Sequence, residues 1–347
     1  MSFAVEKEFP MTGYAGDLLA GKVVLVSGGG TGMGRACALQ LAQCGAKVVL
    51  FARRREVLDH CAEEIAGLGR EPALVTVGDI RDRETIQAAF DQINSVHGRL
   101  DVLVNNAGGQ FMSAAKDISF KGFETVIENN IFGTWNMSKL AFENFFQANG
   151  GKIICVTAVT RSGLAGFAHT ACARGGVTAL AKTLAAEWAE YGIKVNCVAP
   201  GTIKTAALGQ YPVPAGTWDK FQRNLLGRMG QPEDVGNLIV YLASPLGDFI
   251  TGEDWYVDGG ETLHMAHDAR QMMDEIMRLT RSRGDGLAIK RPKRKKAALK
   301  KSPKKTAKKA PAKKKAPTRK AAKKAPAKKA PTRKAAKKAP AKKAARR

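Results

Sequence analysis

The sequence has no long hydrophobic run and no recognisable targeting segment. No stretch of about 18 consecutive apolar residues occurs in it, which excludes a transmembrane helix. The first residues, MSFAVEKEFP, include acidic side chains where a secretory signal has a basic region followed by an apolar one. The final residues, KKAARR, differ from a peroxisomal address of the SKL type. We therefore expect a cytoplasmic protein.

Cysteine is sparse and has no regular spacing. The six cysteines contain no CxxC pair, and no group of histidines accompanies them. A disulfide framework or a zinc site needs such spacing, so neither is expected, and no other metal site is predicted. We predict that the cysteines are small buried side chains in a reducing compartment. They are Cys37, Cys44, Cys61, Cys155, Cys172 and Cys197.

Acidic residues are absent after Asp285, and this absence divides the chain by charge. The sequence has 56 Lys and Arg against 31 Asp and Glu, a formal net charge of +25. Of the basic residues, 29 lie within 290–347, so the first 289 residues carry 27 basic and 31 acidic side chains. The positive charge therefore belongs to the C-terminal end, and the rest of the chain is mildly acidic.

Residues 290–347, the basic tail, consist almost entirely of Lys, Ala, Pro and Arg. The segment 316–329 (APTRKAAKKAPAKK) recurs at 330–343, and proline interrupts any helix. This composition cannot bury a core, so the tail is predicted to be disordered. In composition it resembles the C-terminal tails of linker histones and of some bacterial nucleoid proteins.

The charge of the basic tail predicts a polyanionic partner. A mobile chain with 29 positive charges binds phosphate backbones by counterion release and does not read bases. Because the tail has no aromatic residue, stacking on single strands is not expected. Nucleic acid is the leading predicted partner, with nucleoid association as the matching location. Polyphosphate or an anionic membrane surface is an alternative, and so is a solubilising tail without a dedicated partner.

Before the tail, segments typical of strands and of helices alternate. The strand segments are mostly continuous apolar runs, such as VVLF and VLVN, as in a parallel sheet covered on both faces. This order predicts an α/β fold with a doubly wound parallel sheet in a single domain. The predicted strands are 22–27, 47–51, 73–77, 101–105, 152–157, 193–198 and 255–257. The predicted helices are 33–44, 55–68, 83–97, 122–148, 170–190 and 232–243.

The predicted organisation has four parts: an N-terminal extension 1–19, the α/β domain 20–262, a helix with linker 263–289, and the basic tail 290–347. Apolar residues recur at helical spacing within 263–283, which predicts an amphipathic helix that packs on the core or on a neighbouring subunit. They are Met265, Met272, Met273, Ile276 and Leu279.

The stretch Lys22–Arg35 (KVVLVSGGGTGMGR) predicts a dinucleotide site. An apolar strand leads into a glycine-rich turn, and a helix-forming segment follows. Glycines allow the turn to approach a bulky anion, and the helix start then presents free N–H groups to a phosphate. The strand before and the helix after make this signal more specific than glycines alone.

The residues after the second predicted strand favour NADPH over NADH. A dinucleotide fold that binds NAD places an acid about 20 residues past the glycine turn, where it holds the ribose diol. Here the sequence is FARRR, and no acid occurs before Glu56. Guanidinium groups of Arg53 and Arg54 would suit a 2′-phosphate. Surface charges at a helix start are the alternative explanation.

Several further motifs resemble those of the short-chain dehydrogenase/reductase family over residues 18–263. The glycine turn resembles TGxxxGxG with Ser27 at the Thr position, and NNAG stands at 105–108. Asp79 matches the acid beside the adenine ring, and Asn130 in NNIFG matches the asparagine of the catalytic helix. VNCVAPG around Pro200 and the later DGG at 258–260 complete the set.

The resemblance implies a Rossmann-type fold with a seven-stranded parallel sheet and three helices on each face. It also implies a homodimer or homotetramer formed through the long helices near 122–148 and 170–190. The cofactor-binding residues that it implies, together with the two arginines, are Ser27, Gly28, Gly30, Thr31, Gly32, Met33, Gly34, Arg53, Arg54, Asp79, Ile80, Asn106, Ala107, Gly108, Arg174, Pro200, Gly201 and Ile203.

The catalytic stretch departs from the family pattern. The family has a Ser followed about 13 residues later by YxxxK, in which the Lys lowers the pKa of the Tyr. In this register the chain has Thr157, Thr170 and Arg174 at the Ser, Tyr and Lys positions. A threonine hydroxyl is too weak an acid to replace a phenol, so the sequence argues against ordinary alcohol–ketone chemistry. Arg174 would retain ribose binding, unless it is a helix-surface charge.

A narrower resemblance suits this departure. VNNAGGQF, SFKGF and HTACARGGV are similar to the branch that contains peroxisomal trans-2-enoyl-CoA reductase, and AAEW to the 2,4-dienoyl-CoA reductases. Those enzymes reduce a C=C bond of an acyl-CoA thioester with NADPH. Charge then builds on the thioester oxygen, which needs hydrogen-bond donors but no strong acid.

The resemblance therefore predicts an NADPH-dependent enoyl-CoA or dienoyl-CoA reductase of fatty-acid metabolism. The candidate catalytic residues are Asn130, Thr157, His169, Thr170 and Arg174. His169 is a candidate proton donor, and a histidine satisfied at a helix start is the alternative. Segment 202–230 takes the place of the substrate lid. A carbonyl reductase, or a non-catalytic cofactor-binding protein of the nucleoid, is the alternative function.

Overall fold

The computed structural model describes residues 13–211 and 224–263. The predicted amphipathic helix at 263–283, except its first residue, lies outside the described residues, as do the basic tail and part of segment 202–230. Within the described part, no helix is long and apolar enough to cross a membrane.

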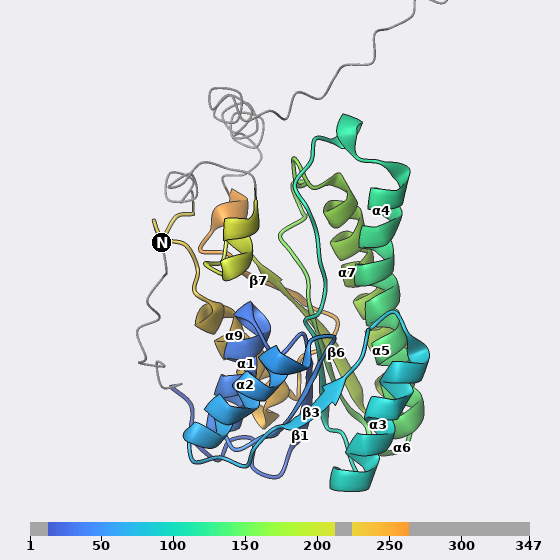
Figure 1. The fold of residues 1–347 in the computed structure, drawn as a ribbon, viewed down its shortest axis with the longest axis vertical. Coiled ribbons are helices and arrows are strands. Elements are labelled where there is room, and N and C mark those ends of the chain that lie inside the picture. Colours follow the sequence, from blue (N-terminus) through green and yellow to red (C-terminus); the bar gives the residue numbers. More distant parts are fainter. Residues whose placement is uncertain (1–12, 212–223, 264–347) are drawn as a thin grey trace, which may run out of the picture. The chain divides into compact units, whose positions relative to one another are not determined.

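Seven parallel strands form one sheet in the described chain (Figure 1). The strand order is β3-β2-β1-β4-β5-β6-β7. Strands β1 to β3 are added toward one edge of the sheet and β4 to β7 toward the other, so the order of addition reverses between β1 and β4. The strands are β1 Val23–Ser27, β2 Lys47–Ala52, β3 Leu74–Val77, β4 Val102–Asn105, β5 Gly151–Val156, β6 Ile193–Pro200 and β7 Asp254–Val257. The predicted doubly wound α/β fold is confirmed. In such a sheet, ligands bind beyond the carboxyl ends of the strands near this reversal.

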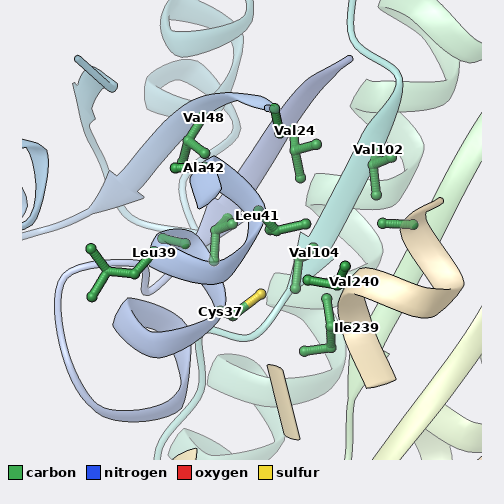
Figure 2. Close-up of a cluster of buried hydrophobic side chains, with 14 of the residues drawn as sticks. Val24, Cys37, Leu39, Leu41, Ala42, Val48, Val102, Val104, Ile239 and Val240 are labelled. Atoms are coloured by element: carbon green, nitrogen blue, oxygen red, sulfur yellow. The ribbon is translucent and has the colours of Figure 1, made fainter. Parts of the chain in front are cut away.

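Helices α1, α2 and α9 cover one face of the sheet. They span Gly32–Gln43, Arg55–Gly67 and Pro232–Ala243. Alternate strand residues such as Val24 and Val104 enter this core, where they meet Leu41 of α1 and Ile239 of α9 (Figure 2). α1 is buried over most of its length because sheet and helices surround it, which explains its lack of a polar face.

The opposite face is covered by α3, by the long helical stretch 120–149 and by α7. α3 spans Arg83–His97, and α7 spans Ala168–Glu187. The other alternate strand residues enter this second core, which contains the aromatic side chains Phe90, Phe142, Phe145 and Phe146. The helices α1 and α7 both begin at the carboxyl edge of the sheet, so their first turns border the same region.

The helix predicted over 122–148 is interrupted twice by π-helical turns. α4 Phe120–Ile127 is followed by a π turn at Glu128–Phe132, α5 Gly133–Ala141, a second π turn at Phe142–Phe146 and a short α6 Gln147–Asn149. In the first π turn the Asn130 side chain donates to the backbone oxygen of Val126 at 2.7 Å. A side chain in the helix ladder displaces the regular backbone bond, and periodicity alone does not reveal this.

The prediction that all six cysteines are buried is wrong for Cys172. Its side chain is exposed on α7, while the other five cysteines are buried, and none of the six forms a disulfide. α7 packs on the sheet through one side only, so a cysteine two residues before the buried Arg174 faces outward.

Candidate active site

The glycine turn joins the carboxyl ends of β1 and β4 through the hydroxyl of Ser27. Its Oγ accepts the backbone N–H groups of Asn106 and Ala107 at 3.1 and 3.0 Å. The hydroxyl donates to the backbone oxygen of Val104 at 3.2 Å. Ser27 is buried, so these three bonds hold the two loops of the predicted dinucleotide site beside each other.

The turn between β1 and α1 is tightly built around two of its glycines. Gly28 has φ of 68°, a left-handed conformation that suits glycine. A Cβ at Gly34 would press on the backbone oxygen of Gly28 and lie 2.5 Å from Nδ2 of Asn106. The start of α1 has no acidic residue in its first turn, and the Thr31 side chain does not cap it. Its N–H groups therefore remain available to an anion, together with the neighbouring backbone at Gly30, Gly32 and Met33.

Asp79 follows β3 and forms a two-pronged ion pair with Arg81. Its Oδ1 accepts from the Arg81 backbone and side chain at 3.0 Å each, and its Oδ2 pairs with the guanidinium at 2.6 Å. The Arg81 hydrogen bonds, and more weakly the charge of Arg53, hold the pKa of Asp79 below its ordinary value. Arg53 and Arg54 are exposed at the start of α2, and Ile80 is buried against Gly133. No motif in the sequence marked Arg81.

Arg174 and Asn130 meet at Gly108. The Arg174 side chain is only 8 % exposed and donates to the backbone oxygen of Val156 at 2.7 Å, so it is no surface charge. Burial lowers its pKa to about 10, which leaves it charged at neutral pH. Asn130 donates to the backbone oxygen of Gly109 at 2.9 Å, while its Oδ1 has no hydrogen-bond partner among the described residues. A Cβ at Gly108 would meet both side chains.

The unpartnered Oδ1 of Asn130 is a buried acceptor that a bound water or ligand would satisfy. A buried acceptor without a hydrogen bond costs free energy, so such groups in folded proteins commonly await a water or a ligand. The oxygen lies next to the Arg174 guanidinium, at the edge of the sheet where β4 and β5 end. The arrangement therefore offers one acceptor and one cationic donor to a polar ligand.

His169 and Thr170 lie at the start of α7 and are both fully buried. The His169 Nδ1 accepts the backbone N–H of Thr170 at 2.7 Å and lies 3.0 Å from its hydroxyl. A neutral imidazole that accepts at Nδ1 carries its proton on Nε2, and burial lowers the His169 pKa, which favours the neutral form. Within the described residues Nε2 has no partner. The ring stacks edge-on against Phe111, with centroids 4.3 Å apart.

Thr157 follows β5 and lies against β6 and β7. Its hydroxyl is 3.2 Å from the backbone oxygen of Val198 and 3.4 Å from Oδ1 of Asp254. The other carboxylate oxygen of Asp254 lies 3.4 Å from the hydroxyl of Thr178, one turn after Arg174 on α7. Asp254 was not foreseen in the sequence, although an acid within the short strand DWYV was a visible signal.

The chain after β6 is held by Glu261. Its carboxylate accepts the Thr202 backbone N–H at 2.7 Å and the Thr202 hydroxyl at 3.0 Å. Gly201 lies so close that a Cβ there would be 2.5 Å from the carboxylate. Ile203 is buried and pairs with Gly230 in an isolated bridge. These contacts fix the Pro200–Ile203 loop beyond the sheet, where the predicted cofactor site continues.

The predicted site residues thus gather in two groups along the carboxyl edge. The first group, named the cradle, consists of the glycine turn, NNAG and the Asp79 region. The second group lies on α7 and the segments beside it, and consists of Asn130, Thr157, His169, Thr170 and Arg174. No group of metal-ligating side chains occurs in the described ranges.

The chain is similar to one family model and to known reductases. The model described as Enoyl-(Acyl carrier protein) reductase matches residues 28–262. The peroxisomal 2,4-dienoyl-CoA reductase of Danio rerio is 32% identical over 266 residues, which cover 75% of this chain and 88% of that protein. The enzyme of the same name from Arabidopsis thaliana is 31% identical over 287 residues, 78% of this chain and 96% of that protein.

Solved structures show the same relationship. A citronellol catabolism dehydrogenase from Pseudomonas aeruginosa PAO1 superposes with a TM-score of 0.64 at 34% identity, over 72% of this chain and 99% of that chain. A short-chain type dehydrogenase/reductase from Mycobacterium marinum gives a TM-score of 0.66 at 33% identity, over 70% and 96%. The family match covers strands β2 to β7, the glycines of the turn and the Arg174 region, and the chain therefore belongs to the short-chain dehydrogenase/reductase family of oxidoreductases.

Proposed function

We propose that the protein reduces the C=C bond of a trans-2-enoyl-CoA or 2,4-dienoyl-CoA thioester with NADPH. The observation that carries this proposal is the replacement of the usual phenol and amine by Thr170 and the buried Arg174. The donors that remain suit an oxygen that gains charge, and the similarity to 2,4-dienoyl-CoA reductases points to the same substrate class.

The cradle residues fit a nicotinamide dinucleotide. Glycines 28 and 34 leave space that a Cβ would fill, and the start of α1 offers backbone N–H groups to a diphosphate. Arg53 and Arg54 are exposed beyond β2, where they can pair with a 2′-phosphate. Asn130 Oδ1 and the Arg174 guanidinium suit the hydroxyls of the second ribose. The bound cofactor supplies a hydride to the substrate.

The residues on and beside α7 would bind the thioester and stabilise the charge that develops on its oxygen. Hydride addition at the β-carbon sends electron density to the thioester oxygen, where preorganised donors stabilise it. Thr157 Oγ and His169 Nε2–H are donors of suitable chemistry, and the second has no protein partner in the described chain. A proton must then reach the α-carbon, and neutral His169 or a water held at Asn130 would deliver it.

A substrate panel tests this function directly. We expect oxidation of NADPH, followed at its absorbance maximum, with trans-2-enoyl-CoA or 2,4-dienoyl-CoA esters, and a clear preference for NADPH over NADH. Simple ketones and imines should not be turned over, because no phenol stands at position 170. Activity on carbonyl compounds but not on enoyl thioesters would contradict the proposal and favour the carbonyl alternative. Tight cofactor binding with no turnover of any substrate would favour a non-catalytic protein.

The basic tail supports a second, independent role. We propose that residues 290–347 bind nucleic acid or another polyanion, since they carry 29 positive charges and no negative one. We further propose a cytoplasmic homodimer or homotetramer, which the tail would attach to the nucleoid. Size-exclusion chromatography with light scattering measures the oligomeric state.

Deletion of residues 290–347 should abolish DNA binding and leave reductase activity unchanged. Fluorescence anisotropy with a labelled duplex should show binding by the full chain that weakens by about 10³-fold or more between about 50 and 200 mM salt, because several phosphate contacts release counterions. Competition by polyphosphate and by anionic vesicles identifies the preferred polyanion. Equal DNA affinity of full and truncated chains would show that the tail has no such role.

A further inference from the structure

Residues 202–204 form a short segment just beyond β6, and Gly230 pairs with only one side of it. The Gly230 backbone N–H donates to the Thr202 oxygen at 3.0 Å, and the Gly230 oxygen accepts the Lys204 N–H at 2.8 Å. In such a ladder the backbone groups of the residue between the two bonded ones point to the opposite side. The N–H and oxygen of Ile203 therefore point away from Gly230. Within the described part of the chain, no hydrogen bond reaches either of them.

The carboxylate of Glu261 fixes the start of this segment. Its Oε2 accepts the Thr202 backbone N–H at 2.7 Å, and its Oε1 accepts the Thr202 hydroxyl at 3.0 Å. Glu261 lies in the turn after β7, which Asp258 holds in shape by accepting the N–H groups of Gly260 and Thr262 at 2.9 Å each. Burial raises the pKa of Glu261, while the hydrogen bonds from Thr202 favour its ionised form. Two bonds to one residue leave the Thr202 backbone little freedom to rotate.

The same turn also holds the chain that returns toward α9. The Leu225 backbone N–H donates to the oxygen of Gly259 in the turn at 2.8 Å. Further along the returning chain, the Arg228 guanidinium pairs with Asp234 in the first turn of α9 at 2.7 Å. The partner strand of the segment, at Gly230, is therefore anchored as well. The segment 202–204 thus has a fixed support on its bonded side.

The free side of Ile203 belongs to the half of the site away from Arg53 and Asp79. In the sheet, β6 lies beyond β4 and β5, while β2 and β3, which those two residues follow, lie beyond β1. Thr205 reaches back to the glycine turn, since a Cβ at Gly32 would be 3.5 Å from the Thr205 methyl carbon. A dinucleotide whose adenosine end lies by Asp79 therefore has its nicotinamide end near this segment. One N–H and one oxygen suit an amide, and the nicotinamide ring carries one.

We propose that Glu261 is a positioning residue for the cofactor, which holds Thr202 so that the free N–H and oxygen of Ile203 are aligned for the nicotinamide end of NADPH before it binds. This proposal rests on the NADPH binding of the proposed function. Glu261 acts through Thr202 and does not itself touch the cofactor. Because the segment is ordered in the free protein, binding does not have to immobilise it. Without Glu261, only the Gly230 pairing would hold the segment in place.

Two ligands distinguish this role from a general loss of structure. Glu261→Ala should raise the dissociation constant for NADPH about tenfold, the size expected for the loss of one hydrogen bond to a charged group. The affinity for 2′,5′-ADP should not change, because this ligand has the adenosine end of NADPH and lacks the nicotinamide end. Isothermal titration of each variant with both ligands measures the two affinities, and thermal unfolding identifies a variant that is not folded.

Conservative variants test the hydrogen bonds themselves. Glu261→Gln should bind NADPH within about threefold of the unaltered protein, because its amide oxygen can accept the Thr202 N–H and its amide N–H can donate to the Thr202 hydroxyl. Thr202→Val removes the hydroxyl and keeps the backbone bond, so it should lose less affinity than Glu261→Ala. The double variant should bind NADPH no more weakly than Glu261→Ala alone, since the two side chains act as one unit.

Glu253→Ala is the matched control, since it removes an exposed carboxylate at the other end of β7. Both of its affinities should equal those of the unaltered protein. NADPH affinity of Glu261→Ala within about twofold of normal, or an equal loss of affinity for 2′,5′-ADP, overturns the proposal while the proposed function stands. If Glu261→Ala does not fold, full NADPH affinity of Thr202→Val has the same meaning. Absence of NADPH binding by the unaltered protein overturns both.

Discussion

Arg174→Met should lower kcat/KM by about 10²- to 10³-fold, the range found when one preorganised donor is removed from an active site. The guanidinium is buried, donates to the Val156 backbone oxygen and borders Asn130 at Gly108. Methionine fills the same space but supplies neither the charge nor the donors. The variant should also bind NADPH more weakly, as measured by the quenching or enhancement of nucleotide fluorescence.

Arg174→Lys distinguishes the charge from the rest of the side chain. A lysine keeps a cation and one donor, so it should recover much of the activity at neutral pH. Burial already lowers the pKa of the arginine to about 10, and the same burial acts on an amine with a lower ordinary pKa. As the pH rises, this variant should therefore lose its cation, and with it its activity, at a lower pH than the unaltered protein does. Activity of Arg174→Met within about threefold of normal would show that the guanidinium serves only the fold.

Gly34→Ala should weaken cofactor binding by at least about tenfold and lower the melting temperature. The added Cβ would press on the backbone of Gly28 and on the Asn106 side chain, both of which belong to the cradle. Inserting a methyl group into a filled site costs about 1–3 kcal/mol, and here the strain can be relieved only by opening the turn. Isothermal titration with NADPH and thermal unfolding measure the two effects.

Gly67→Ala provides the control for this prediction. Gly67 ends α2, and a Cβ there would meet no atom within 4 Å. Alanine is a better helix former than glycine, so stability should stay the same or rise by less than about 1 kcal/mol, with unchanged cofactor affinity. If both variants bind the cofactor normally, the turn tolerates a side chain at position 34 and the cradle is misassigned.

Much of the fold was predictable from local patterns. The apolar runs located all seven strands to within two residues, because a strand covered on both faces has few polar positions. Helix ends were also close, as at Pro232, where a proline and the acidic residues Glu233 and Asp234 mark the first turn. The π turn at Asn130 was not predictable, since it arises from a side-chain bond to Val126 and a tertiary contact with Gly109.

The sequence predicted which residues belong to the candidate site, but not how their side chains are arranged. Motif spacing identified Arg174, while its burial and its contact with Val156 depend on how α7 packs on the sheet. The contact between Thr157 and Asp254 joins two residues whose significance appears only when strands lie side by side. A single sequence contains no direct record of such long-range pairs.

The hydroxyl of Ser27 uses its full capacity for hydrogen bonding, one donation and two acceptances, before any ligand arrives. It therefore has nothing left to offer a cofactor directly. Its contribution is entropic: the two loops are ordered during folding, so association does not have to immobilise them. The rigidity of the free protein therefore increases its affinity for the ligand. The loop should have the same conformation with and without that ligand.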